Sequence, residues 1–95
     1  MLIVLLRFSS NKDRVSDYAE AHKAWIRRGF EDGVFLLAGT MKPMAGGGVL
    51  AHNTTADALQ LRVSQDPFVA KDMVTAEIIE ISPARAEPRL EFLLG

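Results

Sequence analysis

The chain has 95 residues, enough for one domain, and its 48% hydrophobic and 24% charged residues are typical of a globular protein with a thin core. Eleven Lys and Arg residues against twelve Asp and Glu give a net charge of −1, which leaves no positive excess to neutralise a nucleic-acid backbone. The absence of cysteine excludes disulfides, thiol nucleophiles and thiolate metal sites.

The first element is an apolar run over residues 2–8, rich in branched side chains. This pattern predicts a central strand that is buried on both faces. The run is far shorter than the roughly 20 residues that cross a bilayer, and it lacks the basic start of a signal peptide. We therefore expect a cytoplasmic protein without a membrane partner. Arg7 interrupts the run, and it either reaches solvent or binds an anionic substrate.

From residue 14 the period changes to spacings of three and four, which predicts a helix with one buried face. Asp13 or Ser16 is expected to cap its start, and Gly33 suits the left-handed turn after its end. The predicted face comprises Val15, Tyr18, Ala19, His22, Trp25, Ile26, Gly29 and Phe30.

Residues 34–41 predict a second strand, residues 42–48 a loop, and residues 49–52 a third strand that could already start within the three glycines. Near the end of the second strand, Gly39 precedes Thr40. A glycine there would let a ligand or another chain approach the backbone, but the strand could also simply stop.

A second helix follows, with Thr54 or Thr55 as its N-cap. The Asp66-Pro67 pair then predicts the start of a short helix, and residues 74–81 predict the fourth strand. We expect a domain over residues 1–83 and a tail over residues 84–95. The apolar end of that tail, residues 92–94, either lies on a surface or frays.

The order βαββαβ predicts an α+β, ferredoxin-like sandwich with both helices on one face of a four-stranded sheet. The other face needs a cover, and a second copy of the sheet is the natural one. We therefore expect a homodimer with the character of a dimeric α+β barrel.

Few residues point to chemistry. The chain has no phosphate-binding loop, no nucleophilic serine motif and no histidine pair at metal-ligand spacing, so no metal is expected. His22 occupies a slot in the apolar stripe of the first helix. It is either a structural hydrogen bonder or a general acid/base. Asp66 is explained by capping alone, although a carboxylate close to His22 would also fix the imidazole tautomer. Trp25 is more often a core residue than a ligand platform.

Several short motifs follow one another along the chain in a specific order. They are His22 within Ala21-His22-Lys23-Ala24-Trp25, Gly33, residues 35–39, Gly48 and Asp66-Pro67-Phe68. In these motifs the chain resembles the YCII-related (YciI-like) family over roughly residues 1–83. The resemblance implies a ferredoxin-like fold, a dimer with α+β barrel character, and an active site built on His22 and Asp66. It also implies lyase or dehalogenase-type chemistry on small cyclic substrates.

Two features depart from the family pattern. Family members often carry Gly-Pro after the second strand, whereas Thr40 follows Gly39 here and a proline arrives only at Pro43. The tail also continues past the usual end of the family. The first difference changes the rim of the pocket, and the second adds a segment that would serve as an extra dimer contact or a lid.

The leading hypothesis is a small enzyme without a cofactor, in which His22 is the acid/base and Asp66 orients it. Its small-molecule substrate would contact an apolar wall at Trp25. Its polar groups would be bound by side chains near the strand ends, namely Arg7, Thr40 or Lys42. The alternative is a non-catalytic, ligand-binding or regulatory dimer in which His22 and Asp66 form a structural pair. A cofactor-free monooxygenase on a similar dimeric barrel is a third interpretation.

Overall fold

Four strands form one sheet, and the computed structural model describes residues 1–43 and 45–94. The sheet has the order β2-β3-β1-β4. One short 3₁₀ helix, Lys12–Arg14, follows the first strand, and another, Pro88–Leu93, follows the last. The principal elements are β1 (Leu2–Phe8), α1 (Val15–Glu31), β2 (Phe35–Met41), β3 (Gly46–Ala51), α2 (Ala56–Ser64), α3 (Pro67–Ala70) and β4 (Val74–Glu80).

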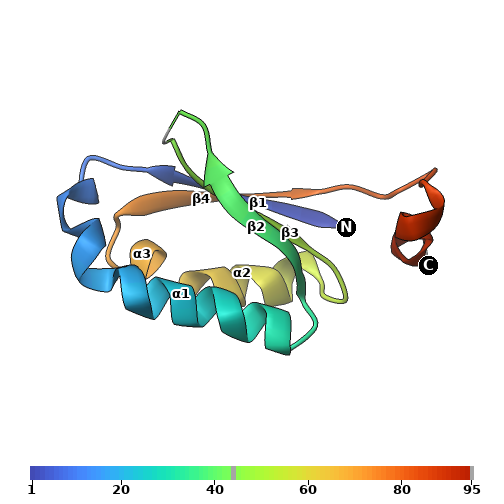
Figure 1. Ribbon diagram of the computed structural model, residues 1–95, viewed down its shortest axis with the longest axis horizontal. Helices are drawn as coiled ribbons and strands as arrows, with labels where there is room; N and C mark the ends of the chain where they lie inside the picture. The colour runs from blue at the N-terminus through green and yellow to red at the C-terminus, as the bar shows by residue number, and fades with distance from the viewer. Residues whose placement is uncertain (44, 95) are drawn as a thin grey trace.

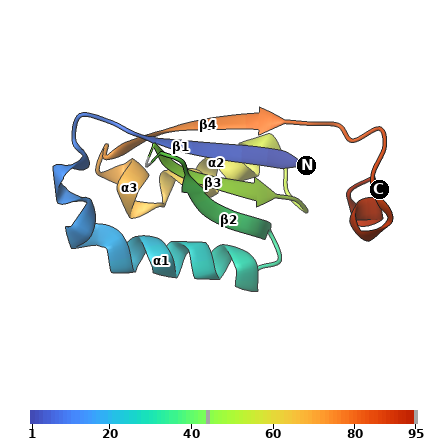
Figure 2. The same ribbon diagram turned by 45° about the horizontal axis from the view of Figure 1, so that its top comes forward.

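The pairing of the strands is ferredoxin-like. β1 pairs antiparallel with both β3 and β4, and β2 pairs antiparallel with β3. β1 and β2, which α1 connects, are therefore parallel and have β3 between them, as in a split βαβ unit. Helices α1, α2 and α3 all lie on one side of the sheet (Figures 1 and 2). The predicted α+β, ferredoxin-like architecture is confirmed.

Strand β1 has one covered face in this chain. Leu2, Val4 and Leu6 are at most 2% exposed and face the helices, whereas Ile3 and Leu5 alternate with them and are half-buried. The prediction of a strand buried on both faces is therefore wrong for the single chain. The sequence is as apolar as that of a fully buried strand, but the three α-helices of the described residues cover only one face.

The core lies between the sheet and the helices. Trp25 packs its indole edge-on against Phe35 with ring centroids 5.2 Å apart, and its indole N–H donates a 2.9 Å hydrogen bond to the carbonyl of Arg62. That bond links α1 to the last turn of α2. Gly29 makes room for this packing, because a Cβ there would lie 2.1 Å from the Phe35 ring. Trp25 is thus a core residue, 4% exposed.

The helix ends follow the predictions only in part. Neither Asp13 nor Ser16 caps α1, because a 3₁₀ turn leads directly into it and the N–H of Val15 donates to the carbonyl of Lys12. At the other end Gly33 has the expected positive φ of 74°. Of the two threonines considered for α2, Thr55 is the cap, and its side chain accepts a 3.1 Å hydrogen bond from the N–H of Ala58.

The glycine run belongs to β3 rather than to a loop. Gly46 pairs with Met41 of β2 and Arg7 of β1, so the predicted loop over residues 42–48 is too long. Glycine is normally depleted in strands, which explains the error. Gly46 has a φ of 136°, and a Cβ there would lie 1.8 Å from the carbonyl oxygen of Leu6. Of the predicted loop, Met44 lies outside the described residues.

The face of the sheet opposite the helices carries a continuous apolar row. We call this surface the open face. Leu37, Leu50, Ile3 and Ile79 are cross-strand partners and form one row over all four strands. Leu37 is 56% exposed and Ile79 is 38% exposed. Such a continuous apolar row on a free surface is typical of an interface.

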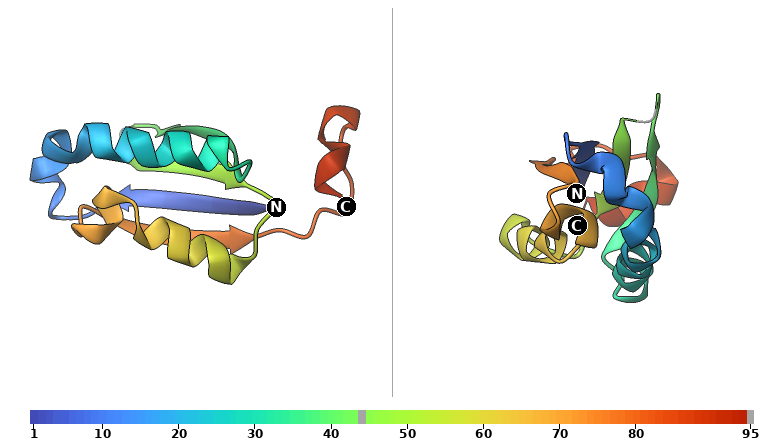
Figure 3. Two further views of the ribbon diagram at one scale, coloured as in Figure 1. Left: turned by 90° about the horizontal axis from the view of Figure 1, so that it is seen from below. Right: turned by 90° about the vertical axis from the view of Figure 1, so that its left-hand side faces the viewer.

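Residues after β4 extend away from the sheet and helices, beyond the ends of the strands (Figures 1 and 3). Here Phe92 is 55% exposed and touches the ring of His52 edge-on, with centroids 5.6 Å apart. Gly95, the last residue of the predicted tail, lies outside the described residues. Within the described part of the chain, no helix combines the length and apolar character needed to cross a membrane.

Candidate active site

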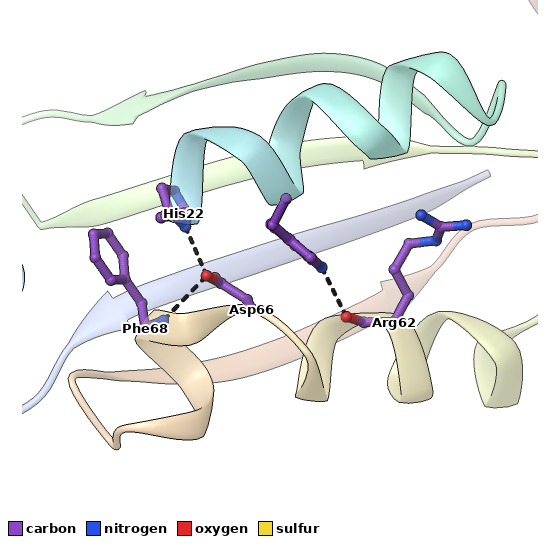
Figure 4. A network of polar contacts seen from close by, with 5 residues as sticks. His22, Arg62, Asp66 and Phe68 are labelled. Carbon is purple, nitrogen blue, oxygen red and sulfur yellow. Dashed lines mark hydrogen bonds and ion pairs between the residues drawn. The ribbon is translucent and has the colours of Figure 1, made fainter. Parts of the chain in front are cut away.

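His22 and Asp66, 44 residues apart in sequence, meet between α1 and α3. The Nδ1 atom of His22 lies 2.7 Å from the Oδ1 atom of Asp66 (Figure 4). The same Oδ1 accepts a 3.1 Å hydrogen bond from the N–H of Phe68, and so caps α3 as the Asp66-Pro67 pair predicts. The turn between α2 and α3 therefore positions the carboxylate, and α1 brings the imidazole to it.

Two aromatic rings hold the imidazole of His22. The ring of Phe68 stacks on it with centroids 4.1 Å apart and an angle of 9° between the planes, and Trp25 lies further along at 5.9 Å. Stacking fixes the plane of the imidazole, and the bond to Asp66 fixes its rotation within that plane. The ring is therefore oriented before any ligand arrives.

Asp66 is the only charged residue in the buried core of the described chain, with 0% exposure. Its Oδ2 atom has no hydrogen-bond partner among the described residues, and His22 is the one ionisable side chain bonded to the carboxylate. A buried carboxylate is costly unless it is paired and hydrogen-bonded. Because an ionised carboxylate can only accept, an ionised Asp66 requires that Nδ1 of His22 carries the hydrogen of this bond.

The opposite edge of the His22 ring is open. The side chain is 21% exposed, and its Nε2 atom makes no hydrogen bond within residues 1–43 and 45–94. His22 lines a pocket of about 260 Å³ between α1, α3 and the sheet. With the hydrogen on Nδ1, Nε2 has the free lone pair that a general base requires.

The pocket is mostly apolar, with a floor of small residues. Strands β2 and β3 contribute Thr40 and the glycines at positions 39, 46 and 47 to the lining. His22 and Lys23 are the only ionisable residues in it. The apolar part of the lining comprises Leu6, Phe8, Ala19, Phe68 and Val74.

The structure brings together four of the seven site residues that the sequence predicts. His22, Gly39 and Thr40 line the pocket, and Asp66 lies behind His22. Trp25 does not line it, because its indole is turned into the core toward Arg62. Lys42 lies in the turn after β2 and is not in the lining either.

Arg7 is on the wrong side of the sheet for the pocket. Its side chain is about half exposed on the open face, where its guanidinium lies 2.6 Å from a carboxylate oxygen of Glu77. Leu6, the neighbour of Arg7, points into the pocket, and successive strand residues point to opposite faces. The interpretation of Arg7 as a substrate-binding residue is therefore not supported in this chain, and the solvent-facing alternative describes its position.

Lys23 is the residue that sequence reasoning missed. A signal existed, since Ala19, His22, Lys23 and Ile26 have the spacing of one helix face. All four line the pocket or an adjoining hollow of about 270 Å³ between α1 and β2. Phe68 was also not assigned to the site, although it directly follows the Asp66-Pro67 pair.

No group of three or more His, Asp or Glu residues that could hold a metal ion occurs in residues 1–43 and 45–94.

Comparisons with known proteins identify a related fold. No protein-family model matches the chain, and no curated protein does. A solved structure that is similar is that of 5-chloro-2-hydroxyhydroquinone dehydrochlorinase from Burkholderia phenoliruptrix AC1100, in complex with 2,5-dihydroxybenzoquinone. The TM-score is 0.68 at 17% identity, and the match covers 85% of this chain and 93% of that one. At this identity the likeness establishes the fold.

The two roles of Asp66 can be separated by substitution. Asn keeps an oxygen that can accept from the N–H of Phe68, whereas Ala removes the cap as well as the partner of His22. We expect Asp66→Ala to lower the free energy of unfolding by about 1 kcal/mol more than Asp66→Asn does. Urea denaturation followed by circular dichroism measures both. Equal losses would show that the cap contributes nothing to stability.

Proposed function

We propose that this chain is a small enzyme of the YCII-related type that uses His22 as a general acid/base on a small cyclic substrate, without a cofactor. The observation that carries the proposal is the oriented His22–Asp66 pair, with Nδ1 bonded to a buried carboxylate and the other ring edge open to a pocket. The fold shared with a dehydrochlorinase supports an elimination as the reaction class.

In such an elimination His22 removes a proton from the substrate through Nε2. The electron pair left behind forms a new π bond, and the leaving group, such as chloride, departs with its own bonding pair. Asp66 holds the proton on Nδ1 and offsets the positive charge that the imidazole gains. The proton then passes from Nε2 to solvent. In the pocket, the Thr40 hydroxyl is available for a polar group of the substrate.

A non-catalytic role has one observation in its favour. The His22–Asp66 bond joins α1 to α3, so it also contributes to the packing of the helices. A purely structural histidine should, however, be sealed and fully hydrogen-bonded. His22 lines a pocket and has a free ring nitrogen within the described chain, which favours the enzyme over a binding or regulatory protein.

We also propose that the protein works as a homodimer whose two open faces pack together. Monomers of 10.4 kDa have about 5,400 Å² of accessible surface, and this chain has 6304 Å². The excess of about 900 Å² is close to the roughly 800 Å² that each partner buries in a standard interface. The apolar row on the open face and the tail after residue 83 both contribute to this excess. The division into a domain and a tail remains a prediction.

The catalytic role of His22 is tested by chloride release from 5-chloro-2-hydroxyhydroquinone under anaerobic conditions. We expect His22→Gln to lower the rate by at least about 100-fold, since general acid/base catalysis contributes 10²–10⁴-fold. The matched control is His52→Gln, which changes the only other histidine and should keep the wild-type rate.

Both variants should retain the circular dichroism spectrum of the native protein. A His22→Gln variant that releases chloride as fast as the native protein would contradict the general acid/base role. Absence of chloride release by the native protein would instead favour the binding protein over the dehalogenase.

The dimer is tested by charging the open face. Ile79→Lys places an ammonium group in the apolar row, and we expect it to weaken dimerisation at least about 100-fold, because a buried unpaired charge is costly. Leu61→Lys is the matched control, since Leu61 is 69% exposed on α2, away from the open face. Light scattering across a concentration series measures both. A native protein that stays monomeric at micromolar concentration would contradict the proposal.

A further inference from the structure

We infer that Lys23 selects the charge of the ligand, so that the site prefers a single ring that bears an ionised oxygen. This inference rests on the proposed function, because it concerns the same pocket. The substrate class is then ring anions, and Lys23 is the residue that discriminates them from neutral rings of the same shape.

Lys23 lies at the solvent-exposed rim of the site. It follows His22 on α1, beside the helix face that carries Ala19, His22 and Ile26, and its side chain is 70% exposed. Lys23 lines both the 260 Å³ pocket and the adjoining 270 Å³ hollow, so it stands where the two meet, directly beside His22.

The charge of the pocket follows from its lining. Asp66 lies behind His22 and is bonded to it, and no carboxylate is among the lining residues. Lys23 therefore supplies a positive charge that no residue in the lining offsets. Among the described residues it pairs with Glu20, at 3.6 Å, and both side chains are highly exposed. Such exposed pairs contribute little, so the ammonium group is free to turn toward a ligand.

The shape of the pocket favours one flat ring. A dry cavity of about 150 Å³ is enough to bind benzene, so 260 Å³ accommodates a single substituted ring. Gly47 leaves room in the floor, because it faces the helices between Thr40 and Leu6 and carries no side chain. Phe68 and Phe8 supply aromatic walls.

An anionic ring also suits the chemistry of His22. An ionised oxygen on the ring pushes electron density toward a leaving group, and a nearby ammonium group holds that oxygen in place. Lys23 and His22 are neighbours in sequence, so they point about 100° apart around the helix. The ligand can then contact the ammonium at its rim while its reacting atom lies at Nε2 of His22.

The test is calorimetric binding with three probes of similar size. Two are anions at neutral pH: 2,5-dihydroxybenzoquinone, with its charge on ring oxygens, and benzoate, with its charge on a carboxylate. The third, 2,5-dimethoxybenzoquinone, has the same benzoquinone ring as the first probe but carries no charge. We expect Lys23→Gln to weaken binding of whichever anion the native protein binds more tightly at least about five-fold. The affinity for the neutral ring should stay unchanged.

Two further variants make the test specific. Lys23→Arg keeps the charge and should restore most of the affinity. Arg27→Gln, one turn further along α1, removes an exposed cation that is paired with Glu31 and lies outside the lining, so it should bind like the native protein. The affinity of the native protein for the anion should also fall with added salt, and that of Lys23→Gln should fall less.

The outcomes separate this inference from the proposed function. Equal affinity of native protein and Lys23→Gln for both anions would overturn the role of Lys23, while binding of the rings would still support the function. Equal loss of the neutral and anionic rings in Lys23→Gln would show that the substitution damages the pocket, and would also overturn the selection of charge. Absence of binding by all three probes would overturn both proposals.

Discussion

The site depends on one buried carboxylate. Asp66 is completely enclosed, and one of its oxygens serves both the imidazole of His22 and the N–H of Phe68. The same oxygen thus starts α3, holds α1 against it, and fixes which nitrogen of His22 carries a proton. Because burying a carboxylate is costly without such partners, the geometry of the helices and the protonation of the histidine are linked.

The two faces of the sheet divide the remaining tasks. The helix-facing side holds the core and, near the end of β2 and the start of β3, the pocket with its glycine floor. The open face carries the apolar row around Ile3 and Leu50, for which the single chain offers no cover. The helices cover one face of the sheet and leave the other face uncovered, and this is the physical basis of the proposed dimer.

The sequence predicts the elements well because they depend on local signals. The Asp66-Pro67 pair and Gly33 mark helix ends through capping and a left-handed turn, and the structure has both. The face on which a residue lies depends on register and on neighbouring elements, and there the sequence was insufficient. Arg7 could not be assigned to the open face, and Lys23 was not assigned to the site although it has the spacing of the helix face that carries His22. The meeting of His22 with Asp66 is tertiary, and only the family resemblance indicated it.

The proposed chemistry of the site depends most on Asp66 holding the proton of His22 on Nδ1. Long-range ¹H–¹⁵N correlation of the neutral imidazole measures this directly, and His52 provides an internal reference. We predict that Nδ1 of His22 has the shift of a protonated nitrogen and Nε2 that of an unprotonated one. We also predict that Asp66→Asn abolishes this preference. A proton on Nε2, or a tautomer mixture that Asp66→Asn leaves unchanged, would contradict the account.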